Sequence, residues 1–138
     1  MLCESEDKYR TLFETMQQGV FYQQADGQLI DVNPAALKMF GLTRDEFLSR
    51  TSDHAAWDVV YEDGSPIPAQ EHPSMVALKT GQPVNDVVAG VFNSRTQNYT
   101  WMIINATPQF RTGETVPYQV AVALHNITEL KQAQERLP

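Results

Sequence analysis

Three stretches in the second half of the chain alternate apolar and polar positions with a period of two. These stretches are residues 84–92, 99–107 and 115–125. Each stretch has one wholly apolar face, as is required of antiparallel strands that are covered on one side. In the second stretch this face includes Met102 and Ile104. Trp101 falls on the opposite face, where we expect it to pack against the N-terminal helix or a partner subunit. The pattern predicts three strands, and Gly113 favours a hairpin between the last two.

The stretch from residue 19 to residue 41 predicts two short strands followed by a helix. Asp26 and Gly27 form a dipeptide that closes hairpins, because glycine accepts a positive φ. Asn33 is placed to cap the helix that follows it, and Pro34 suits the first helical position because it has no N–H to satisfy. Gly41 is suited to end this helix.

The N-terminal segment predicts an amphipathic helix over residues 5–17, with Ser5 as a candidate cap. Its apolar stripe consists of Tyr9, Leu12, Phe13 and Met16. Such a stripe faces either the helix's own domain or a second copy of the chain, and the pattern leaves both possibilities open.

Two further helices are indicated by their ends. Thr43 and Glu46 have the spacing of a capping box, which predicts a short helix from this point. Pro73 suits the first turn of a helix that runs to about Lys79, and Gly81 is its stop. The residues between these helices, 49–70, show no clear period and are expected to be rich in loops.

This order of elements resembles the PAS domain, or sensory-box, family over about residues 8–131. Three features carry the resemblance: the asparagine before the first short helix, the segment AALKMFGLTRDEFL at residues 35–48, and the segment VYEDGSPIPAQEHPSMVALKTGQPV at residues 60–84. The resemblance implies an α+β fold with a five-stranded antiparallel sheet, helices packed over one face, and flanking N- and C-terminal helices. It divides the chain into an N-terminal linker or amphipathic helix at 1–17, a PAS core at 18–126, and the start of a C-terminal signalling helix at 127–138.

The end of the chain resembles the "D–I–T–E–x–K" motif that closes many bacterial PAS domains. Asn126 stands where the family usually has aspartate, so the side chain keeps its capping ability and loses the charge. The resemblance implies that Asn126, Ile127 and Thr128 relay a signal into the last helix. Heptad spacing, as at the start of a coiled coil, is found at Ile127, Leu130, Gln134 and Leu137.

Composition narrows the classes of function. The chain has 138 residues, which suits one domain, and a formal net charge of −7 with only ten basic residues, which argues against binding nucleic acid. The single Cys3 excludes an internal disulfide and fits a reducing cytoplasm. Neither a signal peptide nor a membrane-spanning run is present in the sequence, so we expect a cytoplasmic segment without membrane contact. Charged helical segments at both ends suggest a piece of a longer polypeptide.

The sequence does not favour metal, cofactor or catalytic chemistry. The three histidines, His54, His72 and His125, are too dispersed for a zinc site. Haem-binding PAS relatives use a histidine inside the long helix, whereas His72 immediately precedes Pro73, so the resemblance disfavours haem. Light-sensing PAS relatives bind flavin through a cysteine in the core, and the resemblance excludes that chemistry because Cys3 lies outside the core. Acidic loop residues such as Asp53 and Asp58 are expected to be solvated. Because no nucleophile–base constellation is present, we expect no enzyme activity in this segment, while a small α+β enzyme stays the weakest alternative.

A small ligand would bind between the apolar face of the sheet and the helices, although plain core packing is the alternative at each position. The candidate lining residues are Met39, Trp57, Met75, Met102, Ile104, Val120, Val122 and Leu124. The resemblance implies a sensor in a signalling protein of the two-component type, which senses a small ligand or partner and relays it to a covalently linked output domain such as a histidine kinase or cyclase. The alternative is a ligand-free module for dimerisation. In both interpretations we expect a homodimer formed through the flanking helices.

Overall fold

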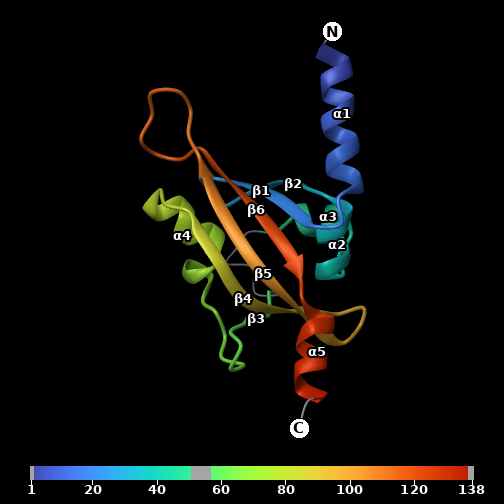
Figure 1. Cartoon of the computed structure of the whole chain (residues 1–138). Coiled ribbons are helices and arrows are strands. Elements are labelled where there is room, and N and C mark those ends of the chain that lie inside the picture. Colours follow the sequence, from blue (N-terminus) through green and yellow to red (C-terminus); the bar gives the residue numbers. More distant parts are fainter. Residues whose placement is uncertain (1, 51–56, 137–138) are drawn as a thin grey trace.

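A computed structural model describes residues 2–50 and 57–136 of the chain (Figure 1). The helical elements are α1 (Leu2–Thr15), α2 (Pro34–Phe40), α3 (Arg44–Leu48), the short 3-10 helix η1 (Ala69–Glu71), α4 (Pro73–Thr80) and α5 (Thr128–Arg136). The strands are β1 (Gly19–Gln24), β2 (Leu29–Val32), β3 (Val59–Val60), β4 (Val84–Asn93), β5 (Asn98–Gln109) and β6 (Gln119–Asn126). Within the described residues, no helix is both long and apolar enough to cross a membrane.

The strands form one antiparallel sheet in the order β2-β1-β6-β5-β4-β3. The α+β class with an antiparallel sheet is therefore confirmed, with one difference in strand number. The sixth strand, β3, has only two residues, which pair with Val91 and Gly90 of β4. A two-residue strand gives no alternating pattern, which is why the sequence predicted a loop there. The last strand also begins later than predicted, at Gln119.

The hairpin and the first core helix are confirmed in detail. Asn33 is the N-cap of α2 and accepts a hydrogen bond from the backbone N–H of Ala36, while Gly41 ends the helix with φ of 69°. Thr43 and Glu46 form the predicted capping box at the start of α3. Helix α4 begins at Pro73 and ends before Gly81, as expected.

The N-terminal helix α1 differs from the prediction at its start. It begins at Leu2, so Ser5 lies inside the helix and is not its cap. Of the predicted apolar stripe, Phe13 is 3% exposed, while Leu12 is 66% exposed. Tyr9 stacks on Phe13, and its hydroxyl lies 3.0 Å from that of Tyr22 on β1. Helix α1 therefore rests on the domain along one edge and leaves its other apolar side chains in solvent.

The hydrophobic core fills the space between the sheet and helices α2, α3 and α4. Helices α1 and α5 leave this body at opposite ends (Figure 1). Trp101 lies on the outer face of the sheet, as its register predicts, but it packs beneath the C-terminal helix. The ammonium group of Lys131 on α5 lies 4.7 Å from the centre of its indole ring, and its ring also covers Gly90.

Candidate ligand pocket and helix junction

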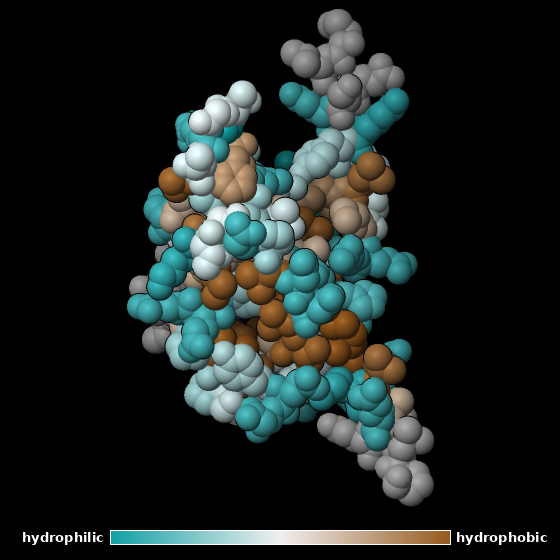
Figure 2. Space-filling model, turned by 60° about the vertical axis from the view of Figure 1, so that its left-hand side comes forward, coloured by the Kyte–Doolittle hydropathy of each residue, from teal (hydrophilic) through white to brown (hydrophobic). Residues whose placement is uncertain are grey.

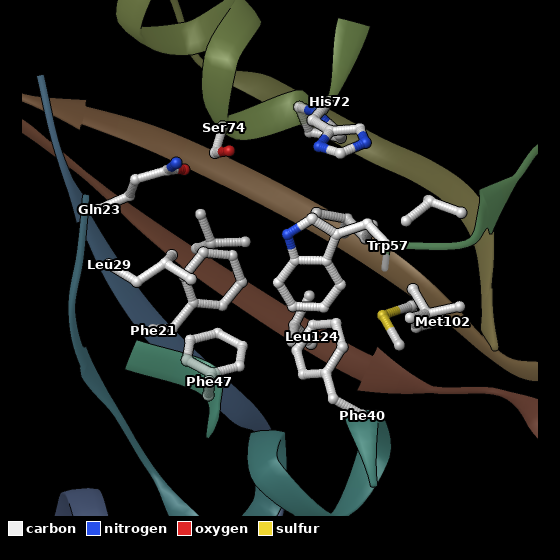
Figure 3. Close-up of a pocket in the computed structure, with 15 residues that line it drawn as sticks. Phe21, Gln23, Leu29, Phe40, Phe47, Trp57, His72, Ser74, Met102 and Leu124 are labelled. Atoms are coloured by element: carbon white, nitrogen blue, oxygen red, sulfur yellow. The ribbon is translucent and has the colours of Figure 1, made fainter. Parts of the chain in front are cut away.

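A cavity of about 70 Å³ lies inside the domain, between the inner face of the sheet and the helices (Figure 3). Each strand of the sheet contributes at least one lining residue, and α2, α3 and the first turn of α4 contribute the others, together with Trp57 and His72. The lining residues are Phe21, Gln23, Leu29, Phe40, Phe47, Trp57, Val59, His72, Pro73, Ser74, Val91, Met102, Ile104, Val122 and Leu124. Most of this surface is apolar, as is usual for a small-molecule site.

Four aromatic rings make up one half of the cavity. The ring centres of Phe40 and Phe47 are 5.2 Å apart. Phe21 and Phe47 make an edge-to-face contact with their ring centres 5.4 Å apart. The indole of Trp57 closes the group with T-shaped contacts to Phe40 at 5.4 Å and Phe47 at 5.9 Å. Edge-to-face contacts of this kind are the favoured arrangement of aromatic rings. The cavity wall is therefore a preformed aromatic surface.

The other end of the cavity is polar. Figure 3 shows Gln23, Ser74 and His72 along the upper side of the pocket, opposite the rings of Phe40 and Phe47. The amide nitrogen of Gln23 donates to the carbonyl of Gly27 at 2.7 Å and lies 3.8 Å from the sulfur of Met75. Ser74 is buried, and its hydroxyl makes no hydrogen bond with another described residue. This hydroxyl is therefore available to a ligand.

His72 is half-buried at the start of α4. Burial lowers the pKa of its imidazole from the ordinary value of 6.5, and a hydrogen bond with the backbone of Ile67 partly opposes this shift. The lowered pKa means that the folded protein favours the neutral ring. The unfolded chain therefore binds a proton at a pH at which the folded chain does not.

We expect His72 to make the protein less stable in mild acid. Its contribution is fully present above the unfolded pKa of 6.5 and is lost as the pH falls from there through the lowered folded pKa. Urea unfolding at pH 7.5 and 5.5 should show a fall in the free energy of unfolding, and His72→Gln should make that fall smaller. The control is His125→Gln, at an exposed position, which should leave the fall unchanged. An equal fall in the His72 variant contradicts the prediction.

The structure brings together most of the predicted lining residues. Five of the eight line the cavity: Trp57, Met102, Ile104, Val122 and Leu124. Val120 is fully buried in the core beside it. Met75 touches the Gln23 amide without lining the cavity, and Met39 instead borders a separate groove between α2 and α5. Whether any of them binds a ligand stays a prediction.

Sequence reasoning missed the phenylalanines and the polar end of the pocket. Phe21 shares the inward-facing side of β1 with Gln23, so the period of two in that strand would have placed both in the interior. Phe40 and Phe47 are the last and the next-to-last residues of two short helices. Only the packing of α2 against β1 and of α3 against β2 brings their rings together, and no local pattern records that packing.

The three predicted relay residues form the junction between β6 and α5. The side chain of Asn126 accepts a hydrogen bond from the N–H of Thr128 at 2.9 Å. The N–H of Ile127 donates to the carbonyl of Trp101 at 2.8 Å, and the N–H of Trp101 donates to the hydroxyl of Thr128 at 3.0 Å. Both backbone groups of Trp101 on β5 thus hold the start of α5. The following residue, Met102, lines the cavity.

The other chemical candidates have structural partners or lie outside the described residues. Asp58 accepts a hydrogen bond from the hydroxyl of Tyr99. Glu62, another acidic residue of the same loop segment, forms an ion pair with Lys131 at 3.2 Å. Asp53 and His54 lie outside the described residues. Across residues 2–50 and 57–136, no group of three or more histidine, cysteine, aspartate or glutamate side chains is arranged to hold a metal ion.

Comparisons with known proteins agree with this fold. A family model described as a PAS domain matches residues 7–70. A domain of a sensory box sensor histidine kinase/response regulator from Geobacter sulfurreducens is 24% identical, covers 91% of this chain and 96% of its own, and has a TM-score of 0.64. The PAS domain of an HTR-like protein from Haloarcula marismortui is 16% identical, covers 91% and 94%, and has a TM-score of 0.68.

A third solved structure is the PAS domain of BvgS from Bordetella pertussis, with 20% identity, coverage of 98% of this chain and 94% of its own, and a TM-score of 0.63. A search of the curated proteins found no match. The antiparallel sheet, the covering helices and the matched segment define the class: the fold is the PAS fold. The PAS fold and the family match over residues 7–70 agree with the resemblance that the sequence motifs indicated.

Proposed function

We propose that this PAS domain is the sensory module of a signalling protein, and that it binds a small ligand in the cavity and relays the binding to α5. The observation that carries the proposal is the position of two neighbouring residues on β5. Met102 faces the cavity, and the backbone of Trp101 holds Ile127 and Thr128 at the start of α5. A ligand that shifts β5 by a small amount therefore acts on both sides of the strand at once.

A second set of contacts also connects the cavity with α5. Trp57 lines the cavity, and the next residue, Asp58, accepts a hydrogen bond from the hydroxyl of Tyr99 at 2.9 Å. The ring of Tyr99 contacts that of Trp101 at 6.3 Å, and Lys131 of α5 lies over Trp101. Spatial continuity supports a relay, and a relay further requires that the ligand bind two arrangements of these contacts with different affinity.

The output partner is proposed from the same resemblance. One structural neighbour is a domain of a sensor histidine kinase/response regulator, which supports a covalently linked output domain of that kind in a two-component system. We place the domain in the cytoplasm, in keeping with a single cysteine and a formal charge of −7. Its role is binding and relay, with no catalysis by this segment.

The test of the proposed function begins with the ligand. Purified protein should be denatured and its organic extract analysed by mass spectrometry and by an absorption spectrum from about 250 to 700 nm. The matched control is Val122→Phe, whose ring fills the cavity, checked for folding by circular dichroism. We expect a compound in the wild-type extract that is missing from the control. Extracts with no difference between the two proteins would count against ligand binding.

The relay is tested by hydrogen exchange on the same protein. The amide of Ile127 bonds to Trp101, and that of Lys131 bonds to Ile127. Adding the extracted compound back to ligand-free protein should change the exchange rates of both amides severalfold. Unchanged rates at saturating compound would contradict the relay.

The alternative function, a dimerisation module, is favoured by apolar side chains on the flanking helices. Leu12 of α1 is 66% exposed and Leu130 of α5 is 57% exposed. Figure 2 shows hydrophobic surface in the middle of one face, between the ends at which these helices leave the body. The proposed occupant is a second copy of the chain. Leu137, which completes the heptad, lies outside the described residues. A concentration-dependent dimer in sedimentation, with an empty extract, would favour this alternative.

A further inference from the structure

The chemistry of the cavity restricts the charge of its occupant. Among the described lining residues, none has a permanently charged side chain, and His72 is the only titratable one. Burial lowers the pKa of His72, which keeps its ring neutral near pH 7. An ionised ligand would therefore lose its hydration without gaining a partner of opposite charge, which is strongly unfavourable. The guanidinium group of Arg50 lies over the indole of Trp57, 4.8 Å from the ring centre, and Arg50 is not part of the lining.

The size of the cavity restricts the occupant further. Its volume of about 70 Å³ is roughly half that of an engineered apolar cavity that holds benzene, ~150 Å³. A single ring therefore enters only if a side chain gives up space. Trp57 is the candidate, because its half-buried indole lies across the middle of the pocket (Figure 3). An aromatic ligand in that place regains the edge contacts with Phe40 and Phe47 that the indole now makes.

We propose that the pocket takes a neutral, single-ring aromatic compound with one hydrogen-bonding group. The ring occupies the space of the Trp57 indole, against Phe40 and Phe47, and its polar group faces Ser74 and His72. This inference rests on the proposed ligand-binding function and specifies its chemistry. Trp57 then acts as an internal competitor, so the measured affinity is reduced by the fraction of molecules in which the indole fills the pocket.

Titration calorimetry with five small probes tests this inference. Phenol has all the proposed features, and each of the other probes lacks one. Toluene has no hydroxyl group and cyclohexanol has no aromatic ring. Benzoate and benzylammonium are ions and therefore lack neutrality. We expect phenol to bind at least about tenfold more tightly than either ion, because the ions are desolvated without a partner. We expect it to bind about fivefold more tightly than toluene, because one hydrogen bond is lost.

Two variants assign the contacts. Ser74→Ala should remove most of the preference for phenol over toluene and leave toluene binding unchanged. The fold should tolerate it, since the hydroxyl makes no hydrogen bond with another described residue. Arg50→Gln should loosen the indole without altering the lining and should tighten phenol binding severalfold. Thr43→Ala, which removes an exposed helix cap and leaves Ser74 and Arg50 unchanged, controls for a general loss of stability and should change neither.

The outcomes separate the ligand class from the proposed function. Benzoate or benzylammonium binding as tightly as phenol would overturn the neutral charge, and cyclohexanol binding as tightly would overturn the aromatic ring. Failure of phenol to bind at ~10 mM would overturn the ligand class as a whole. In each of these cases, an extracted compound that the Val122→Phe control lacks would still support ligand sensing. An extract without such a compound would count against the function itself.

Discussion

Replacing Asn33 by alanine is expected to lower the free energy of unfolding by about 3 kcal/mol, because a cap and two further, partly buried hydrogen bonds are lost together. The side chain is fully buried. Its oxygen accepts from the N–H groups of Ala36, at 3.1 Å, and Val20, at 2.9 Å. Its nitrogen donates to the carbonyl of Gln18 at 2.9 Å. The variant leaves three backbone groups without these partners. Urea unfolding followed by circular dichroism measures the loss.

Thr43→Ala provides the control for the cap alone. Thr43 also caps a helix, and its hydroxyl accepts from the N–H of Glu46 at 3.2 Å, but the pair is exposed to water. We expect this variant to lose about 1 kcal/mol, as an ordinary cap does. An Asn33→Ala loss no larger than the Thr43→Ala loss would show that the bonds to Val20 and Gln18 add nothing.

The comparison between Asn33 and Thr43 shows how far the sequence predicts the fold. Both caps were identified from residue type and position, because capping depends on the next three residues only. The bonds from Asn33 to Val20 and Gln18 cross 13 and 15 positions. They depend on where β1 lies relative to α2. An estimate from the sequence alone therefore gives the size of a simple cap and misses the larger part of the effect.

The candidate site also has one part that local sequence patterns predict and another part that only the fold shows. Strand alternation places Met102, Ile104 and Leu124 on the covered face of the sheet, and all three line the cavity. The outward position of Trp101 also follows from alternation, but the identity of the helix that packs over it does not. Only the return of the chain at Ile127 shows that α5, and not α1, lies over this ring.

The pocket itself depends on helix packing. The rings of Phe40 and Phe47 come from separate short helices, and Trp57 comes from a segment with no periodic pattern. Their contacts at 5.2 to 5.9 Å exist only in the folded domain. The sequence shows that aromatic residues are present. It does not show that they form one wall with Ser74 opposite, and the proposed ligand chemistry follows from that arrangement.

Gly41→Ala is expected to be the most damaging small substitution, with a loss of about 4 kcal/mol in the free energy of unfolding. Gly41 has φ of 69°, a conformation that an alanine adopts only with strain. An added Cβ would also overlap the side chain of Asn93. Asn93 is buried and cannot easily move, because its nitrogen donates to the carbonyls of Lys38 and Met39 at 3.1 and 3.2 Å.

Gly64→Ala separates the overlap from the backbone strain. Gly64 also has a positive φ, of 89°, but no atom lies near the position of an added Cβ. We expect a loss of about 1 kcal/mol from strain alone. Thermal and urea unfolding of both variants measure the difference, which reports the rigidity of the contact between the end of α2 and Asn93. Equal losses would mean that Asn93 moves aside without cost. A large difference would mean that the end of α2, and with it the ring of Phe40 in the pocket wall, is fixed by this contact.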